Sequence, residues 1–164
     1  MVKDLAMKYS WKEKYEHVFE CYCALVNYAF NYIAEKYGKN ELDEFLKASM
    51  STEVLGRAVF SSLKKDVDAE TFLRSYVPHH LMIGSNVRVK NVEPEAITVE
   101  IVKCGSKSML IEKYGSDMTK YYCRHCEVIP VYEQMGWRSE RKTTKCASKG
   151  GNIGCTVIFK KIKC

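Results

Sequence analysis

The hydrophobic pattern of this chain changes its period once, close to Gly84, and this change limits the folds that the chain can adopt. Before Gly84 the residues are compatible with helices. After it, apolar and polar residues alternate in two successive segments, 86–92 and 97–102. Because 164 residues are enough for one domain with a buried core, we expect a single domain with a helical half, 1–82, and a sheet-containing, cysteine-rich half, 83–164.

The helical half begins with a long segment. Ser10 followed by Glu13 fits a capping box and Gly38 fits a C-terminal stop, so the spacing predicts a helix over 11–37. One apolar face of this helix comprises Val18, Tyr22, Leu25, Ala29, Tyr32 and Ile33. A second comprises Phe19, Cys23, Val26 and Phe30. A helix that is apolar on two faces is either central in the core or shared with a partner subunit, and we expect a homodimer through this helix.

Shorter helices are predicted further along the helical half. Their expected ranges are about 40–48, 51–65 and 68–76. Val77-Pro78 is predicted to close the last one, because a residue before proline is disfavoured in helical geometry. His79 and His80 would then lie in a surface loop, although either is a possible metal ligand.

The second half is predicted to form a β-hairpin, a helical insertion and two further strands. The insertion is expected as a helix over 106–114 that Gly115 stops and a helix over 121–135 that Pro130 bends or restarts, with Ser116 or Asp117 as its cap. Extended segments are predicted at 137–146 and 155–162, joined by a turn at 149–152. The class is therefore α+β: an N-terminal helical layer packed on an antiparallel sheet of about four strands, with a helical insertion.

Five of the eight cysteines fall in one stretch of the C-terminal half, between residues 104 and 155. They are Cys104, Cys123, Cys126, Cys146 and Cys155. Zinc takes four ligands in tetrahedral geometry, often including a CxxC such as Cys123-x-x-Cys126, so these residues are candidate metal ligands with Zn²⁺ as the expected ion. Two alternatives stay open, with no cofactor in either: small buried hydrophobic side chains, or reactive thiols that act as a nucleophile or a redox pair.

Groups that can move protons flank the CxxC. His125 can act as a proton carrier and Glu127 as a general base, so both are candidate catalytic residues, and a solvent-facing position on a helix is the alternative for each. Tyr122 is a candidate substrate-binding residue. Arg124 and Arg141 are candidate partners for an anionic substrate group, with Lys145 as a further cation.

Charge and composition indicate which classes of binding partner to expect. Residues 1–82 carry 11 basic and 12 acidic side chains, whereas residues 83–164 carry 15 and 8, so the basic half suits an anionic small molecule. The lysines are dispersed and no nucleic-acid motif accompanies them, so nucleic acid is not expected. No apolar run is long enough for a membrane helix and the start of the chain lacks the apolar core of a signal peptide, so we expect a cytoplasmic protein without a membrane anchor.

The C-terminal third carries an ordered series of motifs. It runs from Val102-Lys103-Cys104 through Tyr122-Cys123-Arg124-His125-Cys126-Glu127 and Glu140-Arg141-Lys142-Thr143-Thr144 to Gly150-Gly151-Asn152-Ile153-Gly154-Cys155 and Thr156-Val157-Ile158-Phe159. This order resembles the L-2-amino-thiazoline-4-carboxylic acid hydrolase family over about residues 97–160. It is similar, more distantly, to 4-vinyl reductase small-molecule-binding domains.

The resemblance implies a domain like those of the 4-vinyl reductase and transport-particle proteins, often dimeric, with a pocket between helices and sheet. It places Cys104, Cys123 and Cys155 at family-type positions. Cys126 departs from the pattern, because hydrolase-like members are expected to carry an acidic residue there. This departure weakens the transfer of the hydrolase activity and favours a metal site.

Three functions follow as expectations. The first is a small hydrolase-like protein that opens a cyclic amidine or thiazoline ring at a cysteine-based site, with or without a metal ion. The second is a sensor domain of the 4-vinyl reductase type that binds a small molecule or a metal without catalysis. The third is a structural zinc domain that mediates protein contact.

Overall fold

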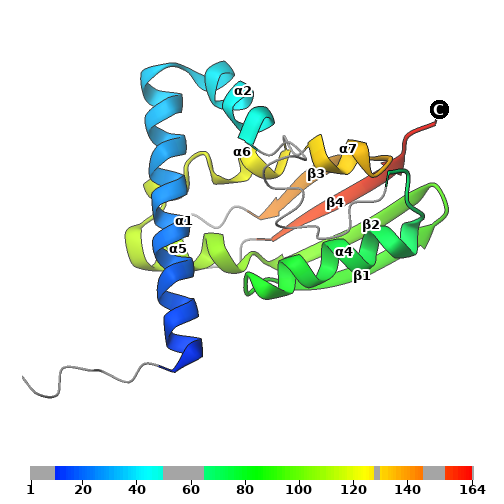
Figure 1. Cartoon of the computed structure of the whole chain (residues 1–164), viewed down its shortest axis with the longest axis horizontal. Coiled ribbons are helices and arrows are strands. Elements are labelled where there is room, and N and C mark those ends of the chain that lie inside the picture. Colours follow the sequence, from blue (N-terminus) through cyan, green and yellow to red (C-terminus); the bar gives the residue numbers. More distant parts are fainter. Residues whose placement is uncertain (1–9, 50–64, 128–129, 146–153, 164) are drawn as a thin grey trace, which may run out of the picture.

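The computed structural model describes residues 10–49, 65–127, 130–145 and 154–163. It confirms the α+β class, with helices layered on one antiparallel four-stranded sheet (Figure 1). The helix predicted near 51–65 falls almost wholly outside the described residues, and the turn predicted at 149–152 falls outside them entirely.

The long N-terminal helix is confirmed as α1 (Trp11–Lys36). The Ser10 hydroxyl accepts a hydrogen bond from the backbone of Glu13, and the Glu13 carboxylate accepts one from the backbone of Ser10 at 2.7 Å, which completes the capping box. The chain then turns at Gly38 into α2 (Lys39–Ser49), which packs against α1. The contact buries an apolar cluster of Phe30, Ala34, Leu42 and Leu46.

Four antiparallel strands form the sheet in the order β1-β2-β4-β3. They are β1 (Asn86–Glu93), β2 (Ala96–Lys103), β3 (Trp137–Lys145) and β4 (Gly154–Lys161). On β2, Ile97, Val99 and Ile101 alternate as buried residues. The predicted alternation of β4 is confirmed as well, because Val157 and Phe159 are buried on the same inner face.

The helical insertion lies between β2 and β3, as predicted. It comprises α5 (Gly105–Tyr114), the 3₁₀ helix η2 (Asp117–Thr119), α6 (Tyr122–Glu127) and α7 (Pro130–Gln134). Gly115 follows α5 with a φ of 83°, a left-handed value that ends the helix. Of the helix predicted over 121–135, the structure describes 122–127 as α6 and 130–134 as α7, which Pro130 begins, while residues 128–129 lie outside the described part.

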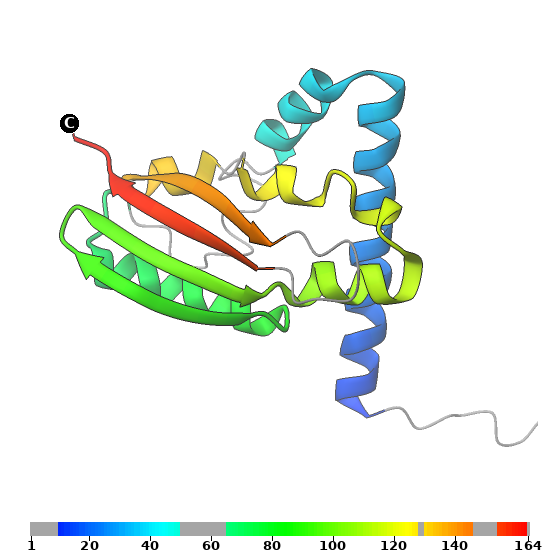
Figure 2. The same cartoon turned by 180° about the vertical axis from the view of Figure 1, so that it is seen from behind.

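The inner face of the sheet is covered by α4 (Ala69–Met82) and α7. Figures 1 and 2 show α4 over the β1 and β2 side and α7 near β3, while the opposite face of the sheet carries no described helix. Phe72 of α4 is fully buried, with its ring centroid 4.6 Å from that of Phe159 and 5.5 Å from that of Trp137. Trp137 also donates a hydrogen bond at 3.0 Å to the carbonyl of Val67, which fixes β3 to the start of α4.

The prediction that Pro78 closes this helix is wrong. α4 continues through Pro78 to Met82. Phe72, Tyr76 and His80 are four residues apart and all buried, so one more turn of helix brings His80 onto the covered face, where its ring centroid lies 4.4 Å from that of Tyr76. This packing outweighs the lost hydrogen bond at the proline, and the expected surface loop at His79 and His80 is helical.

None of the described helices is both long and apolar enough to cross a lipid bilayer.

The central position of Phe72 gives a stability prediction. Phe72→Ala removes a fully buried ring from the contact of α4 with three other aromatic residues and should lower the free energy of unfolding by about 3–5 kcal/mol. Phe45→Ala on α2 is the matched control, because the Phe45 side chain is 43% exposed. Urea unfolding measures both, and equal losses in the two variants would contradict the described core.

Candidate functional site

Four of the five candidate metal ligands gather where the insertion meets the sheet. Cys104 follows β2 and occupies the N-cap of α5, Cys123 and Cys126 lie on α6, and Cys155 lies on β4. Burial is the main cause that raises the pKa values of Cys104 and Cys155, and Cys126 and Cys123 of α6 lie near enough to add to both shifts. The fifth candidate, Cys146, lies outside the described residues.

These thiols lie near one another, but the described ones are not arranged as a set of ligands for one metal ion. Among the residues that the structure describes, no group of three or more His, Cys, Asp or Glu side chains is placed to hold one metal ion. A zinc site that includes Cys146 therefore stays a prediction.

Burial keeps two of the thiols protonated at neutral pH. Removal from solvent is the main cause that raises the pKa of Cys155 to about 11, although the positive charge of Arg141 opposes it. Burial likewise raises the pKa of Cys104. Neither residue is a thiolate in the site as it stands, so neither is poised as a nucleophile.

Arg141 places a positive charge on the inner face of the sheet. It is opposite Val157 in the β3–β4 register, on the same side of β3 as Trp137, and its Nη1 donates a hydrogen bond to Cys155 Sγ at 3.1 Å. Its Nε is sealed from solvent and has no hydrogen-bond partner in the described structure. No described carboxylate forms an ion pair with it.

The groups that face Arg141 are weak acids from four different elements. Tyr76 comes from α4, Cys126 from α6, Tyr132 from α7 and Cys155 from β4, and each lies near enough to affect the pKa of the guanidinium. The Tyr76 hydroxyl is buried and has no hydrogen-bond partner among the described residues, and burial raises its pKa well above the ordinary value. The Arg141 Nε and the Tyr76 hydroxyl are thus two buried donors without a described hydrogen-bond partner, which makes this region a candidate site for an anionic group.

A second cation lies beside the CxxC. Lys107 of α5 is buried, and its Nζ donates a hydrogen bond to Cys123 Sγ at 3.1 Å. Lys107 was not predicted as a site residue, because a lysine in a short helix is usually exposed and nothing in its spacing linked it to Cys123. Tyr76 was missed for a similar reason, since its pattern marks it only as a core residue.

The other predicted site residues fall in different places. The Tyr122 side chain is buried, and its hydroxyl contacts the Ser106 hydroxyl at the start of α5. Arg124 forms an ion pair with Asp43 of α2, with its Nε 2.6 Å from the carboxylate, so its charge is balanced within the protein. The side chains of His125, Glu127 and Lys145 lie outside the described part of the structure.

Comparison with known proteins adds little to this geometry. No protein-family model matches the chain, and no curated protein matches it. Among solved structures, the chain is similar to a trafficking protein particle complex subunit 3 from Naegleria fowleri, covalently bound to palmitic acid, with 15% identity over 92% of each chain and a TM-score of 0.35. This similarity assigns neither a family nor a ligand, and the resemblance to the thiazoline hydrolase family stays a prediction.

The buried thiols predict a fall in stability at alkaline pH. Cys23 and Cys155 have pKa values raised from the ordinary 9.0 to about 11, mainly by burial. Above pH 9 the unfolded chain loses thiol protons that the native state retains, so the free energy of unfolding should fall between about pH 9 and pH 11. Urea midpoints across this range measure the slope, and Cys155→Ala should flatten it. A midpoint that rises with pH would contradict the prediction.

Proposed function

We propose that this protein binds a small molecule with an anionic group, and that Arg141 is the partner of that group. The observation that supports this is the unbalanced guanidinium on an otherwise apolar sheet face. Burying a charge without a counter-ion costs several kcal/mol. A guanidinium presents paired donors that match a carboxylate in a bidentate contact, so a carboxylate ligand would recover much of that cost.

The groups around Arg141 suit an organic anion by their chemistry. Tyr76 and Tyr132 line the same region with aromatic surface, and the free Tyr76 hydroxyl can donate a hydrogen bond to a second ligand oxygen. The site contains no described carboxylate that would repel an anion. This supports a binding or sensor domain as the first candidate function.

Replacing Arg141 tests whether its charge serves binding rather than folding. Arg141→Met removes a buried cation while keeping a similar apolar volume, so the ligand-free protein should be equally stable or more stable, by up to about 4 kcal/mol. The matched control is Arg138→Met on the same strand, because Arg138 is exposed beside Glu133 and should change stability by less than about 0.5 kcal/mol. A large loss of stability in Arg141→Met would show that the arginine holds the fold together.

Ligand binding is tested by thermal shift with two related compounds. L-2-amino-thiazoline-4-carboxylate should raise the melting temperature of the wild type, whereas 2-amino-thiazoline, which lacks the carboxylate, should not. The rise should disappear in Arg141→Met and persist in Arg138→Met. Equal shifts with both compounds would contradict a role for Arg141 in recognising the anion. If neither compound binds, the same thermal-shift comparison of wild type and Arg141→Met is made with small aliphatic carboxylates. A shift that depends on Arg141 would then indicate a different carboxylate ligand, and the absence of any shift would contradict the binding of an anion.

One observation favours catalysis as a second candidate. Lys107 Nζ donates a hydrogen bond at 3.1 Å to Cys123 Sγ, so a cation lies beside a candidate nucleophile. Cys123 Sγ would form a bond to the amidine carbon of a cyclic amidine or thiazoline held by Arg141, while a ring bond to that carbon breaks and the departing ring atom takes up the thiol proton. Water would then hydrolyse the bond to Cys123, which releases the opened product and restores the thiol. This corresponds to the hydrolase that the sequence resemblance implies.

The catalytic candidate has its own test. If Cys123 is the nucleophile, Cys123→Ser should reduce ring opening of L-2-amino-thiazoline-4-carboxylate by roughly a hundredfold or more, and Lys107→Met should reduce it as well. Cys21→Ser is the control, since Cys21 is exposed on α1. Wild-type activity in Cys123→Ser would eliminate this mechanism while leaving the proposed binding by Arg141 intact.

A further inference from the structure

A row of apolar side chains on α1 is largely exposed in the described structure, and only its first member, Tyr15, donates a hydrogen bond to another described element, at 3.0 Å to the Met82 carbonyl of α4. Its members recur at alternating intervals of three and four residues, and we call them the α1 seam: Tyr15, Val18, Tyr22, Leu25, Ala29 and Tyr32. Val18 is 67% exposed and Leu25 69% exposed. The core of the protein uses a different side of α1, where Cys23 and Phe30 are buried.

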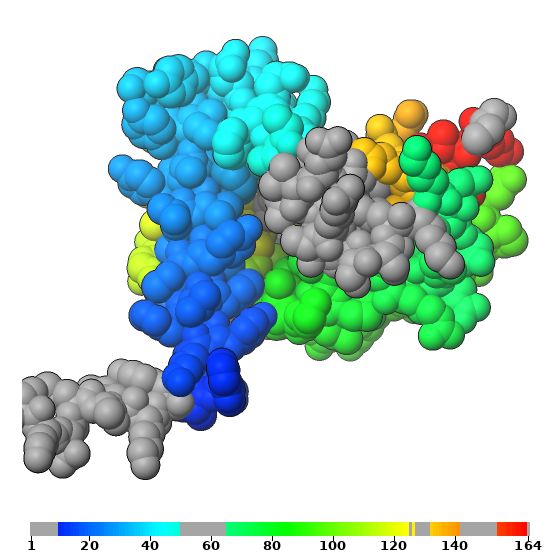
Figure 3. Space-filling model, in the orientation of Figure 1, coloured from blue at the N-terminus to red at the C-terminus, as the bar shows by residue number. Residues whose placement is uncertain are grey.

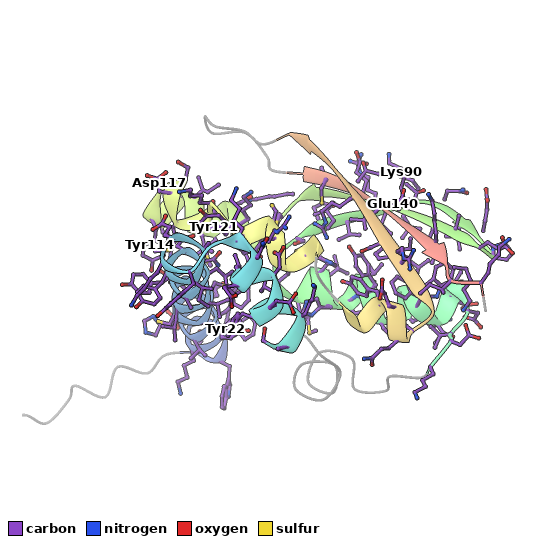
Figure 4. All side chains as sticks on the ribbon, turned by 90° about the horizontal axis from the view of Figure 1, so that it is seen from above. Tyr22, Lys90, Tyr114, Asp117, Tyr121 and Glu140 are labelled. Atoms are coloured by element: carbon purple, nitrogen blue, oxygen red, sulfur yellow. The ribbon has the colours of Figure 1, made fainter. Side chains whose placement is uncertain are left out.

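The spacing of the seam indicates what covers it. A period of 3.5 residues, maintained from Tyr15 to Tyr32, keeps an apolar row facing a second helix in a left-handed coiled coil. Helix α1 has 26 residues and is therefore about 39 Å long. Figure 3 shows it as a column at one end of the molecule, and Figure 4, which views it close to end-on, places Tyr22 there, away from Lys90 and Glu140 on the sheet.

We propose that the α1 seam pairs with the α1 seam of a second copy, in antiparallel orientation. The seam is self-complementary in this orientation, because its positions form facing layers. Tyr22 faces the partner's Leu25, Val18 faces the partner's Ala29, and Tyr15 faces the partner's Tyr32. In each layer the two residue numbers add up to the same value, so a single register satisfies all of them.

Charge supports the antiparallel orientation. The same register places Lys14 opposite the partner's Glu35, at the position that flanks the seam in a coiled coil. By symmetry this contact occurs twice, once at each end. Lys14 and Glu35 are both exposed, and Glu35 contacts only another exposed side chain, Lys120, at 3.3 Å. A parallel pair would instead place Lys14 beside the partner's Phe19, which packs against its own core, and would form no ion pair.

The first test is the oligomeric state of the full chain by analytical ultracentrifugation. The wild type should be a dimer at micromolar concentration. Leu25→Asp should shift it to monomer, by raising the dimer dissociation constant at least about a hundredfold. Val92→Asp is the matched control, because Val92 is 49% exposed on β1, and this variant should remain dimeric. Unchanged far-UV circular dichroism in both variants excludes unfolding as the cause.

Reversal of the flanking charges tests the orientation. Lys14→Glu or Glu35→Lys alone should weaken the dimer several-fold at low salt, because like charges then face each other at both ends. The double variant should restore wild-type affinity. A monomeric wild type would leave the face to a different partner and overturn the proposal. A dimer that survives Leu25→Asp, or single reversals that the double variant does not rescue, would overturn it as well.

Discussion

The apolar inner face of the antiparallel sheet has to be removed from water, and the rest of the described fold follows from how this is done. Phe72 of α4 sits over the centre of this face and contacts rings from β3, β4 and the region of α7. Because α4 and α7 meet the sheet through these rings, their positions are fixed against each other. Arg141 emerges on the same face, and the covering helices then enclose its guanidinium among Tyr76, Tyr132 and thiols. The proposed anion site is thus a consequence of burying the sheet with a cation on its inner face.

The two thiol–cation contacts divide the site into parts with different chemistry. Cys155 shares the sheet with Arg141, and burial raises the pKa of its thiol, so this part suits recognition of charge without reaction. Cys123 on α6 meets Lys107 of α5, at the contact of the insertion with α1. A ligand anchored by Arg141 and a reactive sulfur at Cys123 would combine binding and catalysis, whereas Arg141 without a reactive Cys123 would give a sensor. The fold is compatible with a catalyst and with a sensor, and the reactivity of the Cys123 sulfur distinguishes the two functions.

The sequence predicted the elements that depend on local signals. The capping box at Ser10, the stop at Gly115 and the alternation in β2 and β4 each need only neighbouring residues, and each is present. The end of α4 was mispredicted because the buried contact of His80 with Tyr76 is made in three dimensions and outweighs the local effect of a proline. The site residues show the same difference between local signals and contacts made in three dimensions. Arg141 was selected as a cation, but the balance of Arg124 by Asp43 and the lack of a counter-ion at Arg141 depend on the fold.

The central claim is that the buried guanidinium of Arg141 binds the anionic group of a ligand. Nitrogen-15 NMR of the Arg141 Nε–H group tests it directly, because this group is sealed from solvent and should give a resolved signal that exchanges slowly. We predict that addition of L-2-amino-thiazoline-4-carboxylate moves this signal downfield in a saturable manner, as a carboxylate accepts the hydrogen bond, while 2-amino-thiazoline leaves it in place. A signal that exchanges rapidly with water, or that no carboxylate moves, would contradict the account.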